Sequence, residues 1–205
     1  MRELGIVVFN SPLFNTRSLA ELVLVEGILL LRGVSAKNAA KHHGGWLKSV
    51  DDAYEICGKT LGIVGYNSIG TQLAVLDEAL GMHVVLFDVL TRLLLGNARQ
   101  VPALYNLLAR SDVVSLHVPE TWDKQWMIDE EQLAAMKLGS VLINAFRGTV
   151  VRIEPLAQAL RQKKLLGAAI DVFPIEPRSN KEVFESPLRE FDGAILTPHV
   201  GGSAM

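Results

Sequence analysis

Short apolar runs alternate with helix-patterned segments from residue 58 onward, and this alternation constrains the fold more than any other feature. The runs are about four to six residues long, which is the usual length of a strand, and most of them are apolar throughout. Uninterrupted apolar strands are typical of a parallel sheet that is buried on both faces. Strand–helix–strand units with right-handed crossovers build such a sheet. We therefore predict an α/β fold: a Rossmann-type, doubly wound parallel sheet with helices on both faces.

The predicted strands and helices of this region follow one another in regular order. We expect strands at residues 61–64, 83–87, 113–118, 141–145, 168–172 and 194–197. We expect helices at residues 69–80, 103–109, 130–136 and 154–162. An open α/β sheet binds its ligands at the carboxyl edge, so residues that directly follow a strand are the candidates for a site.

The preceding segment contains a long apolar helix and a polar arm. Ser18 opens the helix, and Glu21 completes a capping-box pattern three residues later. Residues Leu19 to Leu31 are apolar nearly all round, and Gly33 ends the helix. Such a helix is buried, either by its own domain or by a partner. Residues 34–57 are mixed and polar, and we expect a connecting arm with one short helix.

The composition argues against several classes of partner. The chain has 205 residues with 20 basic and 22 acidic side chains, so it lacks the basic excess that binds nucleic acid. Its most apolar stretch, Leu19 to Leu31, is too short to span a membrane and contains Glu21 and Glu26. A single cysteine, Cys57, permits no internal disulfide, and the first residues do not read as a signal peptide, so we expect a cytoplasmic protein. No residues have metal-ligand spacing, and no metal is expected.

A glycine turn follows the first predicted strand. Gly65 and Gly70 match the first and third glycines of the dinucleotide fingerprint G-x-G-x-x-G, and Asp88 ends the next strand. The turn would present a helix N-terminus to a pyrophosphate, and Asp88 would bind the ribose and repel a 2′-phosphate, which favours NAD over NADP. Asn67 stands at the second glycine position. Its side chain either blocks the pyrophosphate, which leaves a plain tight turn, or donates a hydrogen bond to it.

Three polar side chains follow three later strands. Arg147, Glu176 and His199 each lie after a predicted strand. Oxidation of a hydroxy acid needs a histidine that takes the hydroxyl proton, a carboxylate that stabilises the protonated imidazole, and an arginine that holds the substrate carboxylate. Each residue alone also has an ordinary interpretation, as a surface ion pair, a turn or a capped loop. The spacing therefore leaves two alternatives: a catalytic triad, or three separate residues with ordinary structural roles.

Taken together, these segments resemble the D-2-hydroxyacid dehydrogenases, and within that family the branch that oxidises 3-phosphoglycerate. The similar segments cover nearly the whole chain: FNSPLFNTRSLAELVLVEGILLLRGV, GKTLGIVGYNSIGTQL, SDVVSLHVPE, LINAFRGTVV, GAAIDVFPIEP, SPLREFD and LTPHVGG. The resemblance implies NAD-dependent oxidation of 3-phosphoglycerate to 3-phosphohydroxypyruvate by hydride transfer, the first step of serine biosynthesis.

The resemblance also implies a role for individual residues. Arg147 would bind the substrate, Glu176 would support the histidine, and His199 would donate and accept the proton. Together with the glycine turn, the expected cofactor contacts are Gly65, Asn67, Ser68, Ile69, Gly70, Asp88, Ala145, Phe146, Arg147, Asp171, His199, Val200, Gly201 and Gly202. The chain departs from the family pattern at Asn67, at Phe146, where a small residue is usual, and at Arg152, where Asp is usual.

The resemblance implies a division of the chain and a partner. Residues 1–57 would form the interdomain crossing, the long apolar helix and the arm, and residues 58–205 the NAD-binding Rossmann domain. The substrate-binding domain would be largely absent, so we expect the isolated chain to be weakly active or inactive. A homodimer would form through the Leu19–Leu31 helix and the arm that follows it. The alternative is a non-catalytic NAD-binding dimerisation module or a relic of the enzyme.

Overall fold

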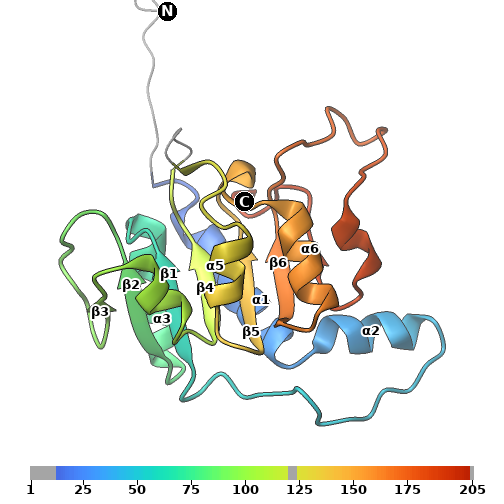
Figure 1. The fold of residues 1–205 in the computed structure, drawn as a ribbon, viewed down its shortest axis with the longest axis horizontal. Helices are drawn as coiled ribbons and strands as arrows, with labels where there is room; N and C mark the ends of the chain where they lie inside the picture. Colours follow the sequence, from blue (N-terminus) through green and yellow to red (C-terminus); the bar gives the residue numbers. More distant parts are fainter. Residues whose placement is uncertain (1–12, 120–123, 204–205) are drawn as a thin grey trace, which may run out of the picture.

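A parallel sheet forms the centre of the fold (Figure 1). The computed structural model describes residues 13–119 and 124–203, and within them the sheet has seven strands in the order β3-β2-β1-β4-β5-β6-β7. The strands are β1 (Thr60–Val64), β2 (His83–Phe87), β3 (Arg99–Gln100), β4 (Val113–Leu116), β5 (Ser140–Asn144), β6 (Leu165–Ile170) and β7 (Ile195–Leu196). Every neighbouring pair is parallel. The strand order reverses between β1 and β4, where such a sheet opens a binding crevice.

Helices cover both faces of this sheet, as the apolar strands predicted. The helices are α1 (Thr16–Leu31), α2 (Val34–His42), α3 (Ser68–Ala79), α4 (Leu104–Leu108), α5 (Glu130–Ala135) and α6 (Ile153–Arg161), with 3-10 turns η3 (Gly148–Val150) and η4 (Pro187–Glu190). Helices α1 and α3 share one buried cluster with the sheet, and α4, α5 and α6 share the other. Figure 1 shows α1 behind the sheet and α5 and α6 in front of it. The predicted doubly wound fold is confirmed.

Most predicted boundaries lie within one residue of the observed ones, and the exceptions have local reasons. β4 ends at Leu116 rather than at residue 118, because its neighbour β5 ends at Asn144, the partner of Leu116. β6 begins at Leu165 rather than at residue 168, since a register shift in β5 lets Leu165 pair with Ser140. The two-residue strand β3 was not predicted, because two residues carry no periodicity and, among the described residues, β3 pairs with β2 alone.

The start of α1 differs from the sequence prediction. The helix begins at Thr16 with Asn15 at its N-cap, not at Ser18. The Ser18 hydroxyl donates to the Asn15 carbonyl at 3.0 Å. The Glu21 carboxylate forms an ion pair with Arg17, one turn earlier, at 2.5 Å. The predicted capping box of Ser18 and Glu21 is therefore wrong, because a neighbouring cation on the same helix face holds the carboxylate.

The apolar surface of α1 is buried mainly within the chain. Leu19, Ala20, Val23, Leu30 and Leu31 are each at most 4% exposed and pack against α3 and the sheet. Of the two interpretations of this helix, burial by its own domain is the one observed.

The arm after α1 contrasts with it, because it exposes apolar side chains. None of the residues in α2 is buried, and the chain that follows turns back and runs along the lower edge of the view to β1 (Figure 1). Trp46, Leu47 and Val50 are 74%, 58% and 87% exposed. The expected interdomain crossing before residue 13 lies outside the described residues. No helix in the described part of the chain is long and apolar enough to cross a membrane.

Candidate active site

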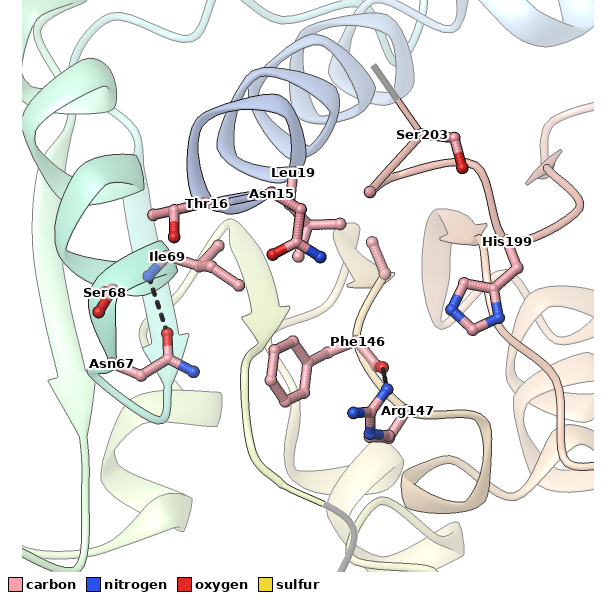
Figure 2. A pocket seen from close by; sticks show the side chains of 12 residues that line it. Asn15, Thr16, Leu19, Asn67, Ser68, Ile69, Phe146, Arg147, His199 and Ser203 are labelled. Atoms are coloured by element: carbon pink, nitrogen blue, oxygen red, sulfur yellow. Dashed lines mark hydrogen bonds between the residues drawn. The ribbon is translucent and has the colours of Figure 1, made fainter. Parts of the chain in front are cut away.

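A cavity of about 500 Å³ opens at the carboxyl edge of the sheet (Figure 2). The β1–α3 turn contributes Asn67, Ser68 and Ile69 to its wall, the segment after β5 contributes Ala145, Phe146 and Arg147, and the segment after β7 contributes His199 and Gly202. All of these were predicted as site residues. The sequence did not predict the other lining residues, Asn15, Thr16, Leu19 and Ser203. The first three reach the wall because α1 packs beside α3 and brings its first turn to the same edge, whereas Ser203 lies in the segment after β7.

The two glycines of the β1–α3 turn are required by its shape. Gly65 has a φ of +91°, and a Cβ there would lie 2.7 Å from the carbonyl oxygen of His117. A Cβ at Gly70 would lie 2.8 Å from the carbonyl oxygen of Gly65. A side chain at either position would therefore force the backbone apart. The turn brings the N-terminus of α3 to the cavity, with the geometry that a dinucleotide pyrophosphate uses.

Asn67 closes this helix N-terminus with its own side chain. Its Oδ1 accepts hydrogen bonds from the N–H groups of Ile69 at 3.0 Å and Gly70 at 3.1 Å. Its Nδ2 donates to the carbonyl oxygen of His117 at 2.9 Å. The backbone φ is −83°, so the position needs no left-handed conformation. Asn67 thus occupies two amides that a bound anion would otherwise use.

Asp88 follows β2 beside the turn, but its carboxylate is covered. Oδ2 accepts from the Tyr66 N–H at 2.8 Å, and Oδ1 accepts from the Leu90 N–H at 2.9 Å. The Nε of Arg92 lies 2.8 Å from Oδ2, and only 5% of the Asp88 side chain is exposed. Burial alone would raise the pKa of Asp88, but the Arg92 guanidinium and the two N–H groups outweigh it and hold the pKa below its usual value. The carboxylate is therefore ionised and largely satisfied within the chain.

His199 and Glu176 form a pair at the edge of the cavity. The Nδ1 of His199 lies 3.2 Å from Oε2 of Glu176, while Oε1 of Glu176 accepts from the Phe173 N–H at 3.1 Å. Both side chains remain accessible, with 53% and 38% exposed. His199 has a φ of +56°, which is strained for a residue with a side chain. Its ring leaves Nε2 available to a ligand, so the pair can accept and stabilise a proton.

Asp171 supports the loop that carries this histidine. It is 1% exposed, and its oxygens accept from the Thr197 hydroxyl, the Val200 N–H at 2.9 Å and the Gly201 N–H at 2.8 Å. Its carbonyl oxygen accepts from the His199 N–H at 2.7 Å. Asp171 therefore holds the strained backbone of His199 in place rather than lining the cavity.

Arg147 lies between the cavity and a second one of about 310 Å³, which is also lined by Glu176 and His199. The three candidate catalytic residues thus share one cavity wall. Nη1 of Arg147 donates to the Phe146 carbonyl oxygen at 3.2 Å, and its guanidinium lies 5.2 Å from the centre of the Phe146 ring. Figure 2 shows the Phe146 ring projecting into the main cavity, between Asn67 and Arg147.

The remaining predicted residues do not line the main cavity. They are Glu176, which lines the second one, and Gly65, Gly70, Asp88, Asp171, Val200 and Gly201. Arg152, the third departure from the family pattern, forms an ion pair with Asp129 at 3.0 Å, outside both cavities. In the described part of the chain, no group of three or more His, Cys, Asp or Glu side chains is placed to hold a metal ion.

Comparison with known proteins identifies the family. Residues 26–201 match the model for the D-isomer specific 2-hydroxyacid dehydrogenase NAD binding domain. The chain belongs to this family. The Rossmann-type sheet and its helices are thus a member of this family of NAD-binding domains. D-3-phosphoglycerate dehydrogenases of Haemophilus influenzae and Escherichia coli are each 56% identical to it over 199 residues, which is 97% of this chain and 48% of each relative.

Solved structures of the family share the fold. D-2-hydroxyisocaproate dehydrogenase aligns with a TM-score of 0.90 at 26% identity, over 98% of this chain and 64% of that one. The D-lactate dehydrogenase of Lactobacillus jensenii with NAD+ aligns with a TM-score of 0.88 at 26% identity, over 98% and 63% of the two chains. The chain spans about half the length of the curated relatives that it matches.

Proposed function

We propose that this chain supplies the NAD-binding half of an enzyme that oxidises 3-phosphoglycerate to 3-phosphohydroxypyruvate, the first step of serine biosynthesis. The observation that carries the proposal is the cavity wall shared by Arg147, Glu176 and His199. The names of the relatives at 56% identity support 3-phosphoglycerate as the substrate.

In this proposal each of the three residues has one task. Arg147 binds the carboxylate of the substrate through its planar guanidinium. His199 takes the hydroxyl proton at Nε2 as the alcohol becomes a ketone, because its Nδ1 faces Glu176 at 3.2 Å. Glu176 then stabilises the protonated imidazole, and the Phe173 N–H fixes the direction of its carboxylate. Asp171 positions the backbone of His199 and does not contact substrate.

The residues around the cavity fit a dinucleotide, but the Asn67 side chain competes with its pyrophosphate for two backbone amides. The glycine turn, Ser68 and Ile69 at the start of α3, and the segment after β5 would hold NAD, which supplies the oxidising nicotinamide ring when bound. Asn67 has to release the amides of Ile69 and Gly70 before they can bind the pyrophosphate. We propose the same set of cofactor contacts as the family resemblance implies, with Asp171 acting indirectly.

The arm supports a proposed homodimer. Residues 43–57 expose Trp46, Leu47 and Val50, a cluster that a second copy of the chain would cover. We propose that the contact uses α2 and this arm, while α1 contributes only its outer face, where Val25 is 49% exposed. We further propose that residues 1–57 connect the domain to a substrate-binding domain, and that the protein is cytoplasmic.

A non-catalytic NAD-binding dimerisation module is the second candidate. One observation favours it: the Phe146 ring lines the cavity beside the guanidinium of Arg147, the proposed substrate-binding group. In this reading the chain binds the dinucleotide but turns over nothing.

Two measurements test these proposals. Titration of the chain with NADH, followed by fluorescence, tests the cofactor site, and we expect saturable binding. A chimera that replaces the matching half of the Haemophilus influenzae enzyme with this chain tests the reaction. We expect it to produce NADH from 3-phosphoglycerate and to lose this activity on His199→Ala. A folded chimera that binds NADH but turns over no substrate would support the second candidate.

A further inference from the structure

A third cavity, of about 500 Å³, lies beside the edge strand β7, and the proposed reaction does not use it. We call it the outer cavity. The loop between β6 and η4 supplies one wall, and the segment from Leu196 to His199 supplies the other. Of the residues that line the outer cavity, His199 is the one that also lines the main cavity, so the two spaces are distinct. The outer cavity is therefore a candidate for a second ligand.

Aromatic side chains form the apolar part of the outer cavity. The rings of Phe173 and Phe184 pack edge to face with their centres 4.6 Å apart. Phe173 and Leu196, which also lines the cavity, pack against the buried cluster on the α4, α5 and α6 side of the sheet, so the core fixes their positions. A further aromatic ring can add to such a pair through the same edge-to-face contact. This part of the cavity favours a ligand that carries an aromatic ring.

Two charged side chains of opposite sign line the same cavity, Arg178 and Glu182. A tight turn joins them: the Arg178 N–H donates to Oε2 of Glu182 at 3.0 Å, and the Glu182 N–H donates to the Ser179 carbonyl oxygen at 3.1 Å. Within the described residues, the Arg178 guanidinium makes no hydrogen bond or ion pair, and Oε1 of Glu182 accepts no hydrogen bond. The turn therefore presents an unpaired cation and a carboxylate with free acceptor positions.

The other charged residues of this wall are already engaged with one another. Nδ1 of His199 lies 3.2 Å from Oε2 of Glu176, and Oε1 of Glu176 accepts from the Phe173 N–H at 3.1 Å. The polar groups of a ligand in the outer cavity are therefore selected by Arg178 and Glu182.

One cation, one anion and an aromatic wall match a zwitterion that carries a ring. A guanidinium binds a carboxylate through paired hydrogen bonds, and a carboxylate binds an ammonium group through charge-assisted ones. We propose that the outer cavity binds a free α-amino acid with an aromatic side chain. Its carboxylate binds Arg178 and its ammonium group binds Glu182, while its ring packs against Phe173 and Phe184. The inference does not depend on the proposed reaction, because the amino acid and the nucleotide occupy different cavities.

Calorimetric titration with L-phenylalanine, 3-phenylpropionate and 2-phenylethylamine tests this assignment, because the three probes share the ring and differ in their charged groups. We expect L-phenylalanine to bind with a dissociation constant on the order of 1 mM, and each of the other two to bind at least about tenfold more weakly. Arg178→Gln should weaken L-phenylalanine and 3-phenylpropionate but leave 2-phenylethylamine unchanged. Glu182→Gln should weaken L-phenylalanine and 2-phenylethylamine but leave 3-phenylpropionate unchanged, and its amide oxygen can still accept from the Arg178 N–H.

Lys181→Gln is the matched control, because it removes an exposed cation from the same turn that does not line the cavity, and it should leave all three affinities unchanged. Equal affinity for the three probes would overturn the inference, and so would an absence of binding or an equal loss in Lys181→Gln and Arg178→Gln. Circular dichroism spectra show whether each variant retains the fold. Displacement of bound NADH by L-phenylalanine, followed by fluorescence, would place the amino acid in the main cavity and would also overturn it. Binding of NADH without any binding of L-phenylalanine would remove the outer site and leave the proposed function intact.

Discussion

Replacement of Asn67 by glycine tests whether the chain competes with its own cofactor. The Asn67 side chain holds two N–H groups of α3, from Ile69 and Gly70, and it is itself held by the carbonyl oxygen of His117. A pyrophosphate that binds these amides has to displace Oδ1 first. Glycine at this position leaves both amides free, so we expect Asn67→Gly to bind NADH more tightly and to be less stable without it.

The structure sets the size of both effects. Each of the two hydrogen bonds to Oδ1 contributes about 1 kcal/mol net, so their release costs the ligand about 2 kcal/mol. This corresponds to roughly 30-fold in the dissociation constant of NADH. Loss of the cap costs a few tenths of a kcal/mol, and loss of the His117 contact about 1 kcal/mol. The unliganded variant should therefore melt about 3–5 °C below the unmodified chain.

Fluorescence titration with NADH measures the affinity, and two further variants separate the causes. Asn67→Ala removes the capping oxygen but keeps a Cβ, and its φ of −83° suits alanine, so it should gain nearly as much affinity as glycine. Asn67→Asp keeps the cap and adds a negative charge, so it should bind NADH more weakly than the unmodified chain. Folded Asn67→Gly and Asn67→Ala with unchanged NADH affinity would refute the reasoning.

Three other substitutions have definite expected outcomes. Burial, reinforced by the charge of Asp171, raises the pKa of Glu26 to about 8. The folded state therefore holds a proton that the unfolded state loses above about pH 4.5, and the stability of the fold falls as the pH rises towards 8. Glu26→Gln removes this titration, so its melting temperature should change less between pH 6 and 9 than that of the unmodified chain. Asp171→Asn turns an amide group towards backbone N–H groups and should cost about 2 kcal/mol, a fall of about 4–8 °C in a calorimetric melt. Phe146→Ser removes the aromatic ring from the cavity and should lower the dissociation constant of NADH, measured by fluorescence, about two- to tenfold. An unchanged dissociation constant would show that the ring does not contact the ligand.

The sequence predicted the features that depend on strand order. His199 and Glu176 are far apart along the chain, yet each follows a parallel strand, and parallel strands end at one edge of the sheet. Their pairing at 3.2 Å is the arrangement that this rule anticipates. The tight turn at Gly65 and Gly70 could also be predicted, because only glycine fits there.

The features that the sequence missed depend on tertiary contacts. The direction of the Asn67 side chain is set by the carbonyl oxygen of His117, which follows β4, whereas Asn67 follows β1. Arg92 covers Asp88 because Gln100 of the two-residue strand β3 fixes an irregular loop, and neither the loop nor the strand has a periodic pattern. Asn15 joins the cavity through the packing of α1 beside α3, which no local motif encodes.

Asn67 and Arg92 have one physical consequence in common: the unliganded domain satisfies its own binding groups. The α3 amides bond to Asn67, and Asp88 faces Arg92, so little polar capacity is left unpaired in the absence of nucleotide. A domain without Asn67 would gain more from ligand, because ligand stabilises a fold by RT ln(1 + [L]/Kd). Melting temperature and ligand-induced shift should therefore move in opposite directions in Asn67→Gly: a lower melting temperature alone, and a larger rise at saturating NADH. A variant that melts lower but gains no extra shift would show that the cap serves stability only.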